Sequence, residues 1–411
     1  MGRPHEGATQ RSSGRLAGRT VALCVTGSVA AYKAALLVRL LVKEGASVVP
    51  VMTESAAKFV GAATLSGLTG HAALGSAEMW STPGELHVEL GASADAVVVA
   101  PASADVLARI AQGRADDLVT ALVLCAKGRV LAAPAMHPRM WAHPATQKNA
   151  EVLRAQGRVE IVGPDVGAVA SGDEGPGRMA EPESILEAVV YALTPKDLEG
   201  VRVVVTAGPT LEDMDPVRFL GNRSSGKMGF AVAARAASRG ADVTLIAGPV
   251  GLPTPHRTRR VDVRSALEMQ AALAKARAEC DALVMAAAVA DYRPASTSKT
   301  KVKKTGETAT LDLARNPDLL AELGQARKGP RPVLVGFALE TGTRKDIVAE
   351  ARRKLREKKV DVVVANDAST AFGGDDNEIT LVTENREERL PRASKLDLAD
   401  ALLDRIKSLL G

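Results

Sequence analysis

The stretch Ala207–Gly229, AGPTLEDMDPVRFLGNRSSGKMG, decides how the rest of the chain is interpreted. It follows the apolar, β-branched run 201–206 and precedes the helical pattern of residues 230–239, so it links a buried strand to the start of a helix. Backbone amides at such a connection point toward anions, its glycines let a ligand approach closely, and Arg223 and Lys227 add positive charge. The stretch therefore predicts a phosphate or nucleotide cradle rather than a loop that is merely rich in Gly and Ser.

One alternative is a P-loop, because the segment Gly221–Met228, GNRSSGKM, nearly fits the pattern G-x-x-x-x-G-K-[ST]. Met228 stands where that pattern needs a hydroxyl for Mg²⁺, and the segment begins well after the preceding strand ends instead of directly following it. These two departures argue against a P-loop nucleoside triphosphatase.

The composition is that of a folded protein with two domains. The 411 residues are 46% hydrophobic and 25% charged, which is enough for two ordinary domains with full cores. A net charge of +5 suits polyanionic small molecules as well as nucleic acid, but aromatic residues make up only 2%, which argues against stacking platforms for single strands. We therefore expect small-molecule substrates and no nucleic-acid partner.

The N-terminal stretch and the cysteines indicate a cytoplasmic protein. Met1–Arg19 is rich in Arg, Gly and Ser without an apolar core, which predicts a flexible leader and no secretory signal. The apolar run 21–42 contains Lys33 and Arg39, so no membrane span is expected there. The three cysteines lie in or beside apolar runs without metal-ligand spacing, as expected of reduced core thiols.

Both halves of the chain open with the same strand–helix–strand pattern. Residues 21–53 run from VALCVTGS through a helix to EGASVVPVMT, and residues 201–248 run from VRVVVTAG through a helix to RGADVTLIAG. The polar turn signals LTPKDLEG at 193–200 mark the boundary between them. The predicted fold class is α/β, with two doubly wound parallel domains at 20–193 and 194–411.

Other segments complete this prediction. Strands are expected at 96–100, 130–133, 282–285, 333–336 and 360–364. A hairpin over 378–390 precedes a terminal helix that Ser394 and Asp397 cap. The segment 168–181 is dense in Gly and Pro and predicts a mobile flap, whereas the lysine-rich segment 294–308 predicts a solvated loop that either closes over an anion or is a plain charged surface.

Taken together, these motifs resemble the bifunctional phosphopantothenoylcysteine decarboxylase/phosphopantothenate–cysteine ligase family of bacterial coenzyme A synthesis, over nearly the whole chain after the leader. The first half is similar to the flavin-containing cysteine decarboxylases through GSVAAYK (27–33), PASAD (101–105), ADDL (115–118), PAMHPRMW (134–141) and GPGRM (175–179). The second half is similar to the Rossmann-like ligase through the opening stretch, AAAVADYRP (286–294), KVKK (301–304), NPD (316–318), GFALET (336–341) and KLREKKVD (354–361).

The resemblance implies that the second half activates the carboxylate of 4'-phosphopantothenate with CTP, giving an acyl-cytidylate and pyrophosphate, after which the amine of cysteine displaces CMP. Asn222 matches the asparagine that binds phosphopantothenate and handles the acyl-cytidylate, and its neutral amide suits both carbonyl and phosphoryl oxygens. Asp291 would hold the nucleotide and Mg²⁺. Lys301, Lys354 and Lys358 would neutralise the triphosphate, with Lys301 catalytic, although the last two would by default form a solvated helix face.

The remaining nucleotide contacts follow from the same resemblance. They are Pro317, Asp318, Leu319, Leu320 and Phe337, the last of which either packs on the cytosine or fills the core. The run Asn316–Asp318 also suits the start of a helix, with the asparagine as cap.

For the first half the resemblance implies FMN. The residues that match its site are Gly27, Ser28, Thr53, Ser55, Phe59 and Ser103, at the expected carboxyl ends of strands. His87 matches the active-site histidine and suits a base near neutral pH. Met140 and Arg178 match substrate-binding positions. The family also implies a homo-oligomer, trimer-based through the flavin domain and dimeric through the ligase domain.

Two positions depart from the family. His137 stands where the family has an asparagine that holds the substrate carboxylate, and Ser171 stands where it has a cysteine that donates a proton. A hydroxyl is a far weaker acid than a thiol with a pKa of about 8.5. Three hypotheses stay open: a working bifunctional enzyme, an active ligase joined to an impaired or scaffold-only flavin domain, and a nucleotide-sensing protein without turnover.

Overall fold

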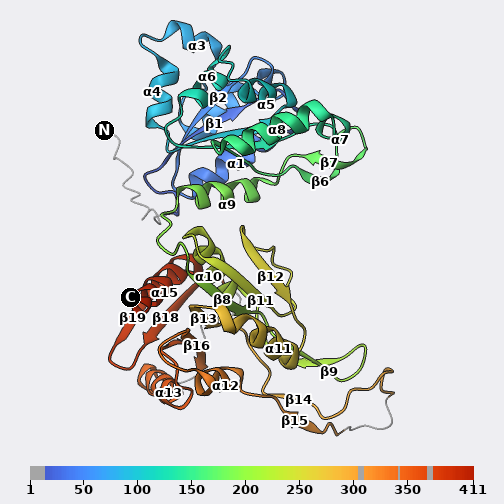
Figure 1. Cartoon of the computed structure of the whole chain (residues 1–411), viewed down its shortest axis with the longest axis vertical. Coiled ribbons are helices and arrows are strands. Elements are labelled where there is room, and N and C mark those ends of the chain that lie inside the picture. Colours follow the sequence, from blue (N-terminus) through green and yellow to red (C-terminus); the bar gives the residue numbers. More distant parts are fainter. Residues whose placement is uncertain (1–13, 304–309, 341–342, 368–373) are drawn as a thin grey trace, which may run out of the picture. The chain divides into compact units, whose positions relative to one another are not determined.

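The computed structural model describes residues 14–303, 310–340, 343–367 and 374–411 (Figure 1). The chain divides into two compact units, 1–194 and 195–411. Most of the expected leader, the end of the lysine-rich loop and Thr341 of the GFALET motif lie outside the described residues. In the part of the chain that the structure covers, no helix is long and apolar enough to cross a membrane.

The first unit is built on a five-stranded parallel sheet of order β2-β1-β3-β4-β5. Its strands are β1 (Thr20–Val25), β2 (Ser47–Met52), β3 (Ala96–Ala102), β4 (Arg129–Pro134) and β5 (Val159–Ile161). Its helices are α1 (Tyr32–Lys43), α2 (Ala62–Thr69), α3 (Ser76–Ser81), α4 (Leu86–Ser93), α5 (Ala104–Ala111), α6 (Leu118–Cys125), α7 (Pro138–Trp141), α8 (Pro144–Gln156) and α9 (Pro182–Leu193).

Alternate residues of β1 supply two separate cores, as expected for a parallel strand that is buried on both faces. Val21, Leu23 and Val25 belong to a core shared with α1 and α9. Ala22 and Cys24 belong to a second core shared with α5, α6 and α8. Helices therefore cover both faces of the sheet, which confirms the doubly wound arrangement for this unit.

The expectation of a flexible leader up to residue 19 is wrong for residues 14–19. The Leu16 side chain is only 1% exposed and belongs to the first core. The Arg15 guanidinium pairs with Glu44 at 2.9 Å and with Glu187 at 2.8 Å. These contacts join residues far apart in the sequence, so composition alone could not reveal them.

The segment 168–181, expected to be a mobile flap more than packed structure, contains a regular element. Strands β6 (Asp165–Ala168) and β7 (Glu174–Arg178) form an antiparallel hairpin. Its turn is closed by a hydrogen bond from the Val169 amide to the Asp173 carbonyl at 3.0 Å. The glycines that suggested mobility have a packing reason, because a Cβ at Gly177 would lie 2.4 Å from the Met136 carbonyl oxygen.

The second unit is built on an eight-stranded sheet of order β12-β11-β8-β13-β16-β17-β18-β19. Its strands are β8 (Arg202–Ala207), β11 (Asp242–Ala247), β12 (Thr258–Asp262), β13 (Ala282–Met285), β16 (Val333–Glu340), β17 (Val362–Asp367), β18 (Asp376–Val382) and β19 (Glu387–Ser394). The first six strands are parallel and the last two are antiparallel. The parallel strands, counted along the chain, have the order 3-2-1-4-5-6 of the Rossmann fold.

Helices cover both faces of this sheet as well. They are α10 (Lys227–Ser238), α11 (Ala266–Ala276), α12 (Leu319–Ala326), α13 (Arg344–Glu357) and α15 (Lys395–Leu410). One core joins α10 and α15 to Val203 and Val205, and the other joins α11, α12 and α13 to Val204 and Ile246. Short strand pairs β9 (Leu211–Asp213) with β10 (Phe219–Gly221) and β14 (Tyr292–Pro294) with β15 (Leu313–Arg315) extend from it (Figure 1).

The predicted cap residue is confirmed at α15 and is wrong at α12. Ser394 caps α15 by accepting a hydrogen bond from the Asp397 amide at 3.1 Å, and the hairpin before it forms as expected. At α12 the cap is Asp318, whose carboxylate accepts from the Ala321 amide, and not Asn316 as predicted. Asn316 is instead buried, and its side-chain amide donates to the Ala290 carbonyl at 2.8 Å.

Candidate functional site

The loops that follow β8 and β13 meet where the strand order of the second sheet reverses. The Ala288 amide donates to the Gly208 carbonyl at 2.9 Å, and the Ala290 amide donates to the Thr210 hydroxyl at 3.0 Å. In open α/β sheets the crevice at such a switch point, beyond the carboxyl ends of the strands, is where ligands bind.

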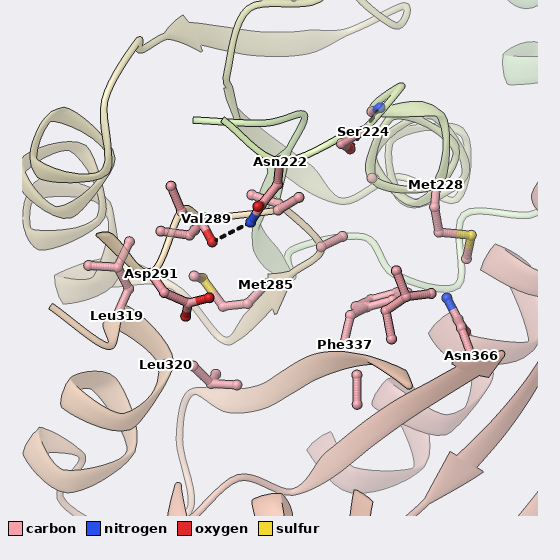
Figure 2. Close-up of a pocket in the computed structure, with 18 of the residues that line it drawn as sticks. Asn222, Ser224, Met228, Met285, Val289, Asp291, Leu319, Leu320, Phe337 and Asn366 are labelled. Carbon is pink, nitrogen blue, oxygen red and sulfur yellow. Dashed lines mark hydrogen bonds between the residues drawn. The ribbon is translucent and has the colours of Figure 1, made fainter. Parts of the chain in front are cut away.

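A pocket of about 700 Å³ opens at this crevice (Figure 2). Nine of the ten residues that the resemblance assigned to the ligase reaction line it: Asn222, Asp291, Pro317, Asp318, Leu319, Leu320, Phe337, Lys354 and Lys358. They come from the loops after β8 and β13, from the start of α12, from β16 and from the end of α13. Segments more than 130 residues apart in the chain thus share one cavity.

One wall of the pocket is the glycine-rich start of α10. Gly226 caps the helix in the left-handed region with φ of +73°, and Gly208 has φ of +77°. A Cβ at Gly226 would lie 3.4 Å from the Gly208 backbone, and one at Gly229 would lie 2.6 Å from the Ala207 Cβ. Glycine is therefore required for the helix start to approach β8, which presents the first amides of α10 to the cavity.

Asn222 and Asp291 approach the pocket from neighbouring loops. The Asn222 side-chain amide donates to the Val289 carbonyl at 2.9 Å, which fixes the orientation of the amide plane (Figure 2). The Asp291 carbonyl accepts from the Asn316 amide at 2.8 Å, so the loop after β13 is tied to the start of α12. Buried Asn316 thus positions Asp291.

The lining is positively charged, as a polyanion site requires. Six basic residues line it (Arg223, Lys227, Arg315, Lys354, Lys358 and Lys395), against two acidic ones (Asp291 and Asp318). The Lys358 ammonium lies 2.9 Å from the Asp318 carboxylate. Desolvation acts to raise the pKa of that carboxyl, but the hydrogen bonds from Lys358 and the Ala321 amide outweigh it and hold the pKa below its usual range. Asp318 is therefore ionised and holds Lys358 at the edge of the cavity.

Lys301 is not brought to this pocket. It is exposed in the segment 295–303, whose Val302 amide donates to the Asp215 carboxylate at 3.2 Å. Hydrogen bonds from Arg218 and from the amides of residues 217, 218 and 302 hold the pKa of the Asp215 carboxyl well below its usual range. The single described chain does not place Lys301 beside the other two lysines, and its role in the reaction stays a prediction.

Other pocket residues escaped the sequence analysis. They are Asn366 at the end of β17, Asn377 in β18 and Lys395 at the start of α15. The Asn366 side-chain oxygen is buried without a hydrogen-bond partner among the described residues. A polar residue at the carboxyl end of the apolar run VVVAND was a usable signal for it, because such strand ends meet at the ligand-binding edge. Figure 2 shows Asn366 beside Phe337.

In the first unit, the residues assigned to FMN gather at the carboxyl ends of β1, β2 and β3. A Cβ at Gly27 would lie 2.5 Å from the Ser55 hydroxyl, which in turn lies 3.0 Å from that of Thr53. Ser28 caps the helical turn that leads into α1, and Ser103 caps α5. The exposed Phe59 follows close behind Ser55 on the same loop.

Thr26, which the sequence analysis did not single out, joins two of these strand ends. Its buried hydroxyl donates to the Pro101 carbonyl at 2.7 Å and accepts from the Ser103 amide at 3.1 Å. Two helix starts and several hydroxyls thus face one edge of the sheet at its switch point, which fits the phosphate and ring oxygens of a flavin nucleotide.

His137 and Ser171 share one partner. His137 Nε2 lies 2.6 Å from Asp173 Oδ2, and the Ser171 hydroxyl donates to the same oxygen at 3.1 Å. His137 follows β4, whose end is bonded to β3 through the Ala135 amide and the Ala102 carbonyl at 3.0 Å. This group therefore lies beside the end of the strand that leads to Ser103.

The other residues assigned to the first unit, Met140, Arg178 and His87, are not joined to one another by a described hydrogen bond or ion pair. Met140 is half exposed on α7. Arg178 ends β7 and pairs with Glu181, which also accepts from the buried Lys33 at 3.0 Å. His87 is half-buried on α4, and no described hydrogen bond or ion pair joins it to the other assigned residues. Within one copy of the described chain, the predicted base is thus not linked to the flavin edge.

No group of three or more His, Cys, Asp or Glu side chains is arranged to hold a metal ion among the residues described. Asp291, a single carboxylate beside a strongly basic cavity, fits the way Mg²⁺ binds through one or two carboxylates together with substrate phosphates.

Each of the two units matches a known protein family. Residues 9–194 match the flavoprotein family, and residues 198–410 match the C-terminal domain family of DNA/pantothenate metabolism flavoproteins. The coenzyme A biosynthesis bifunctional protein CoaBC of Mycobacterium bovis is 46% identical over 408 residues, covering 96% of this chain and 97% of that protein. The protein of the same name from Vibrio cholerae is 43% identical over 394 residues, covering 94% and 98%.

A solved structure of the C-terminal domain of a coenzyme A biosynthesis bifunctional protein CoaBC, 36% identical, covers 52% of this chain and 98% of that chain with a TM-score of 0.45. The sequence identity to the Mycobacterium bovis and Vibrio cholerae proteins extends over nearly the whole of both chains. The chain belongs to the family of coenzyme A biosynthesis bifunctional proteins, which confirms the resemblance carried by its motifs.

Proposed function

We propose that this chain catalyses two consecutive steps of coenzyme A biosynthesis: CTP-dependent ligation of cysteine to 4'-phosphopantothenate, and decarboxylation of the resulting 4'-phosphopantothenoylcysteine to 4'-phosphopantetheine. The observation that carries the ligase assignment is the basic pocket at the switch point of the second sheet, where nine assigned residues meet. A protein that only binds a nucleotide would need the positively charged pocket. It would not need Asn222, whose side-chain amide is held in place beside that pocket.

In the ligase reaction, an oxygen of the phosphopantothenate carboxylate attacks the α-phosphorus of CTP and pyrophosphate leaves; the cysteine amine then attacks the acyl carbon and CMP leaves. Lys354 and Lys358 neutralise the charge that builds on the leaving pyrophosphate. The Asn222 amide, oriented by Val289, donates to the oxygens of the reacting centre. Asp291 would hold Mg²⁺, which would add to the neutralisation of the phosphate charge.

Lys301 stays part of this proposal on the strength of the family resemblance. Its segment is anchored at Val302 to Asp215, so Lys301 reaches the nucleotide only if the segment moves or if a second copy supplies it. Supply of Lys301 by a second copy is compatible with a dimer of ligase domains, which the family resemblance implies.

In the first unit, Gly27, Ser28, Thr53, Ser55, Phe59 and Ser103 would hold FMN, which when bound supplies the electron sink that decarboxylation of a cysteine derivative requires. Gly27 leaves room where a Cβ would meet Ser55, and the hydroxyls offer donors to the phosphate. His87 would accept a proton from the substrate, while Met140 and Arg178 would contact its chain.

Association of subunits is part of the proposal, trimer-based through the flavin domain and dimeric through the ligase domain. Val29, Tyr32 and Leu36 are 57%, 58% and 49% exposed, and their spacing places them along one side of the first helical segment, next to Ser28. An apolar stripe of this kind beside the flavin edge supports burial against another copy. Free thiols at all three cysteines support a cytoplasmic location.

The test is to assay each half-reaction separately. Purified protein given CTP, 4'-phosphopantothenate and cysteine is expected to release pyrophosphate, with much lower rates when ATP replaces CTP. The isolated protein is expected to be yellow and to release CO₂ from 4'-phosphopantothenoylcysteine. No pyrophosphate release at saturating substrates would leave the binding-protein hypothesis, and ligation without CO₂ release would leave a ligase joined to an impaired flavin domain.

A further inference from the structure

The carboxylate of Asp173 is surrounded by three donors from two elements. His137 Nε2 and the Ser171 hydroxyl lie 2.6 Å and 3.1 Å from its Oδ2, and the Arg139 guanidinium lies 3.7 Å from the same atom. His137 and Arg139 belong to the start of α7, whereas Ser171 and Asp173 belong to the turn of the β6–β7 hairpin. An imidazole, a hydroxyl and a guanidinium thus gather around one carboxylate oxygen, and these are groups that bind carboxylates.

The protonation of this group follows from its hydrogen bonds. His137 Nδ1 accepts a hydrogen bond from the Arg139 backbone amide at 3.1 Å, so Nδ1 carries no proton and Nε2 must donate to Asp173. The hydrogen bonds from His137 and Ser171 lower the pKa of the Asp173 carboxyl. An anionic carboxylate therefore occupies the single ring N–H that His137 can offer to a ligand.

We propose that Asp173 fills, in the substrate-free flavin domain, the position that the carboxylate of the substrate takes, and that substrate binds by displacing Asp173 from His137 Nε2, Ser171 and Arg139. This inference rests on the proposed decarboxylase function and on the family resemblance, in which an asparagine at the position of His137 holds that carboxylate. It adds Arg139 as a substrate-binding residue and makes Asp173 a positioning residue that competes with the substrate.

The surrounding structure permits this exchange without unfolding the hairpin. At the open end of the hairpin, the Met136 amide donates to the Gly177 carbonyl at 2.9 Å, which fixes the base of the hairpin on the residue before His137. The turn itself is held by the Asp173 carbonyl and by Gly172, whose φ of +86° lies in the left-handed region. The Asp173 side chain is half exposed, so rotation of that side chain releases the subsite.

The exchange would affect substrate and product differently. The substrate carries a carboxylate that replaces Asp173, whereas the decarboxylated product has none and leaves the contact between Asp173 and His137 undisturbed. Asp173 thus weakens the binding of carboxylate ligands alone, because only they must displace it from His137 and Arg139.

The experiment measures binding and needs no turnover. Two probes are titrated calorimetrically into the full-length, flavin-loaded protein: 4'-phosphopantothenoylserine, which keeps the carboxylate but has a hydroxyl in place of the thiol, and 4'-phosphopantothenoylethanolamine, which lacks the carboxylate. Asp173→Asn should tighten binding of the carboxylate probe about tenfold, because a neutral amide competes less well than a carboxylate. Binding of the ethanolamine probe should change less than about twofold.

Two further variants make the result specific. Arg139→Gln should weaken the carboxylate probe about threefold and leave the other unchanged; its side chain is 85% exposed, so folding is not at risk. Glu174→Gln removes the same charge from the adjacent exposed residue, for which the described structure shows no ion pair, and should change neither probe more than about twofold. All three substitutions lie in the first unit, so the differences report that unit and not the ligase pocket.

The possible outcomes separate this inference from the proposed function. If both probes bind the wild-type protein but Asp173→Asn weakens the carboxylate probe, leaves it unchanged or affects both probes equally, the competition by Asp173 is refuted while the decarboxylase assignment stands. If neither probe binds the flavin-loaded protein, the decarboxylase assignment is refuted and this inference with it.

Discussion

The two units of this chain use the same kind of parallel sheet, yet their candidate sites are built from different parts of it. In the second unit the pocket is formed by strand ends and by a helix start that only glycine allows to approach β8. In the first unit a similar edge is lined with hydroxyls, but the residues beside it, His137 and Ser171, are engaged by Asp173 on a hairpin turn.

From this difference we expect the two sets of motifs to tolerate change differently. A pocket formed by backbone geometry depends on where strands end, and strand ends follow from the buried core. A site completed by an exposed hairpin depends on a few side chains, so replacing Asn and Cys by His and Ser alters its hydrogen bonding without disturbing the sheet.

Asn222→Ala should reduce pyrophosphate release about 100-fold or more, because it removes an oriented donor from the reacting centre. Release of CO₂ from added 4'-phosphopantothenoylcysteine and the flavin absorbance should stay unchanged, since Asn222 lies in the other compact unit. Parallel loss of both activities would show that the two sites are coupled and would break the comparison.

Lys354→Gln should lower kcat/KM for CTP about tenfold by removing one cation from the triphosphate. Lys345→Gln is the matched control, because Lys345 is an exposed lysine of the same helix that does not line the pocket. Steady-state kinetics with CTP varied would check this, and equal effects of the two substitutions would mean that only the general positive field matters.

Ser171→Cys should raise the rate of CO₂ release with complete conversion to 4'-phosphopantetheine about fivefold, because a thiol with a pKa of about 8.5 is a better proton donor than a hydroxyl. Product analysis by mass spectrometry distinguishes full conversion from a stalled unsaturated thiol. An unchanged or lower rate would show that the His137–Asp173–Ser171 group already supplies what the cysteine does in the family.

Asp215→Asn should lower the Tm of the second unit by a few degrees at pH 7. The pKa of Asp215 is lowered on folding, so its ionised form stabilises the folded state above the unfolded pKa of about 3.9, and this stabilisation is lost as pH falls through the folded value. The difference from wild type should therefore shrink in acid. Calorimetry against pH checks this, with Asp242→Asn, exposed at the start of β11, as the control.

The sequence predicted the fold well because its signals are local. Apolar β-branched runs bounded by turns predicted the parallel strands, and the resemblance of the motifs to a known family identified nine residues of the ligase pocket. Capping was less reliable: Asp318 and not Asn316 caps α12, since two polar residues near a helix start compete and burial decided between them.

Contacts between distant segments could not be obtained in this way. Nothing in the sequence near Leu16 shows that it packs into the first core, and nothing near Val302 shows that Asp215 holds the segment of Lys301 away from the pocket. Asn366 and Lys395 reach the cavity only because β17 and α15 pack where they do.

By itself, then, the sequence determined two doubly wound domains, their order and the strand ends at which their chemistry takes place, because hydrophobic periodicity and turn residues act over a few neighbouring positions. Only the tertiary structure decided which side chains share a partner. His137 and Asp173 are 36 residues apart, and their meeting depends on how a hairpin packs against the end of a strand, which no local pattern encodes.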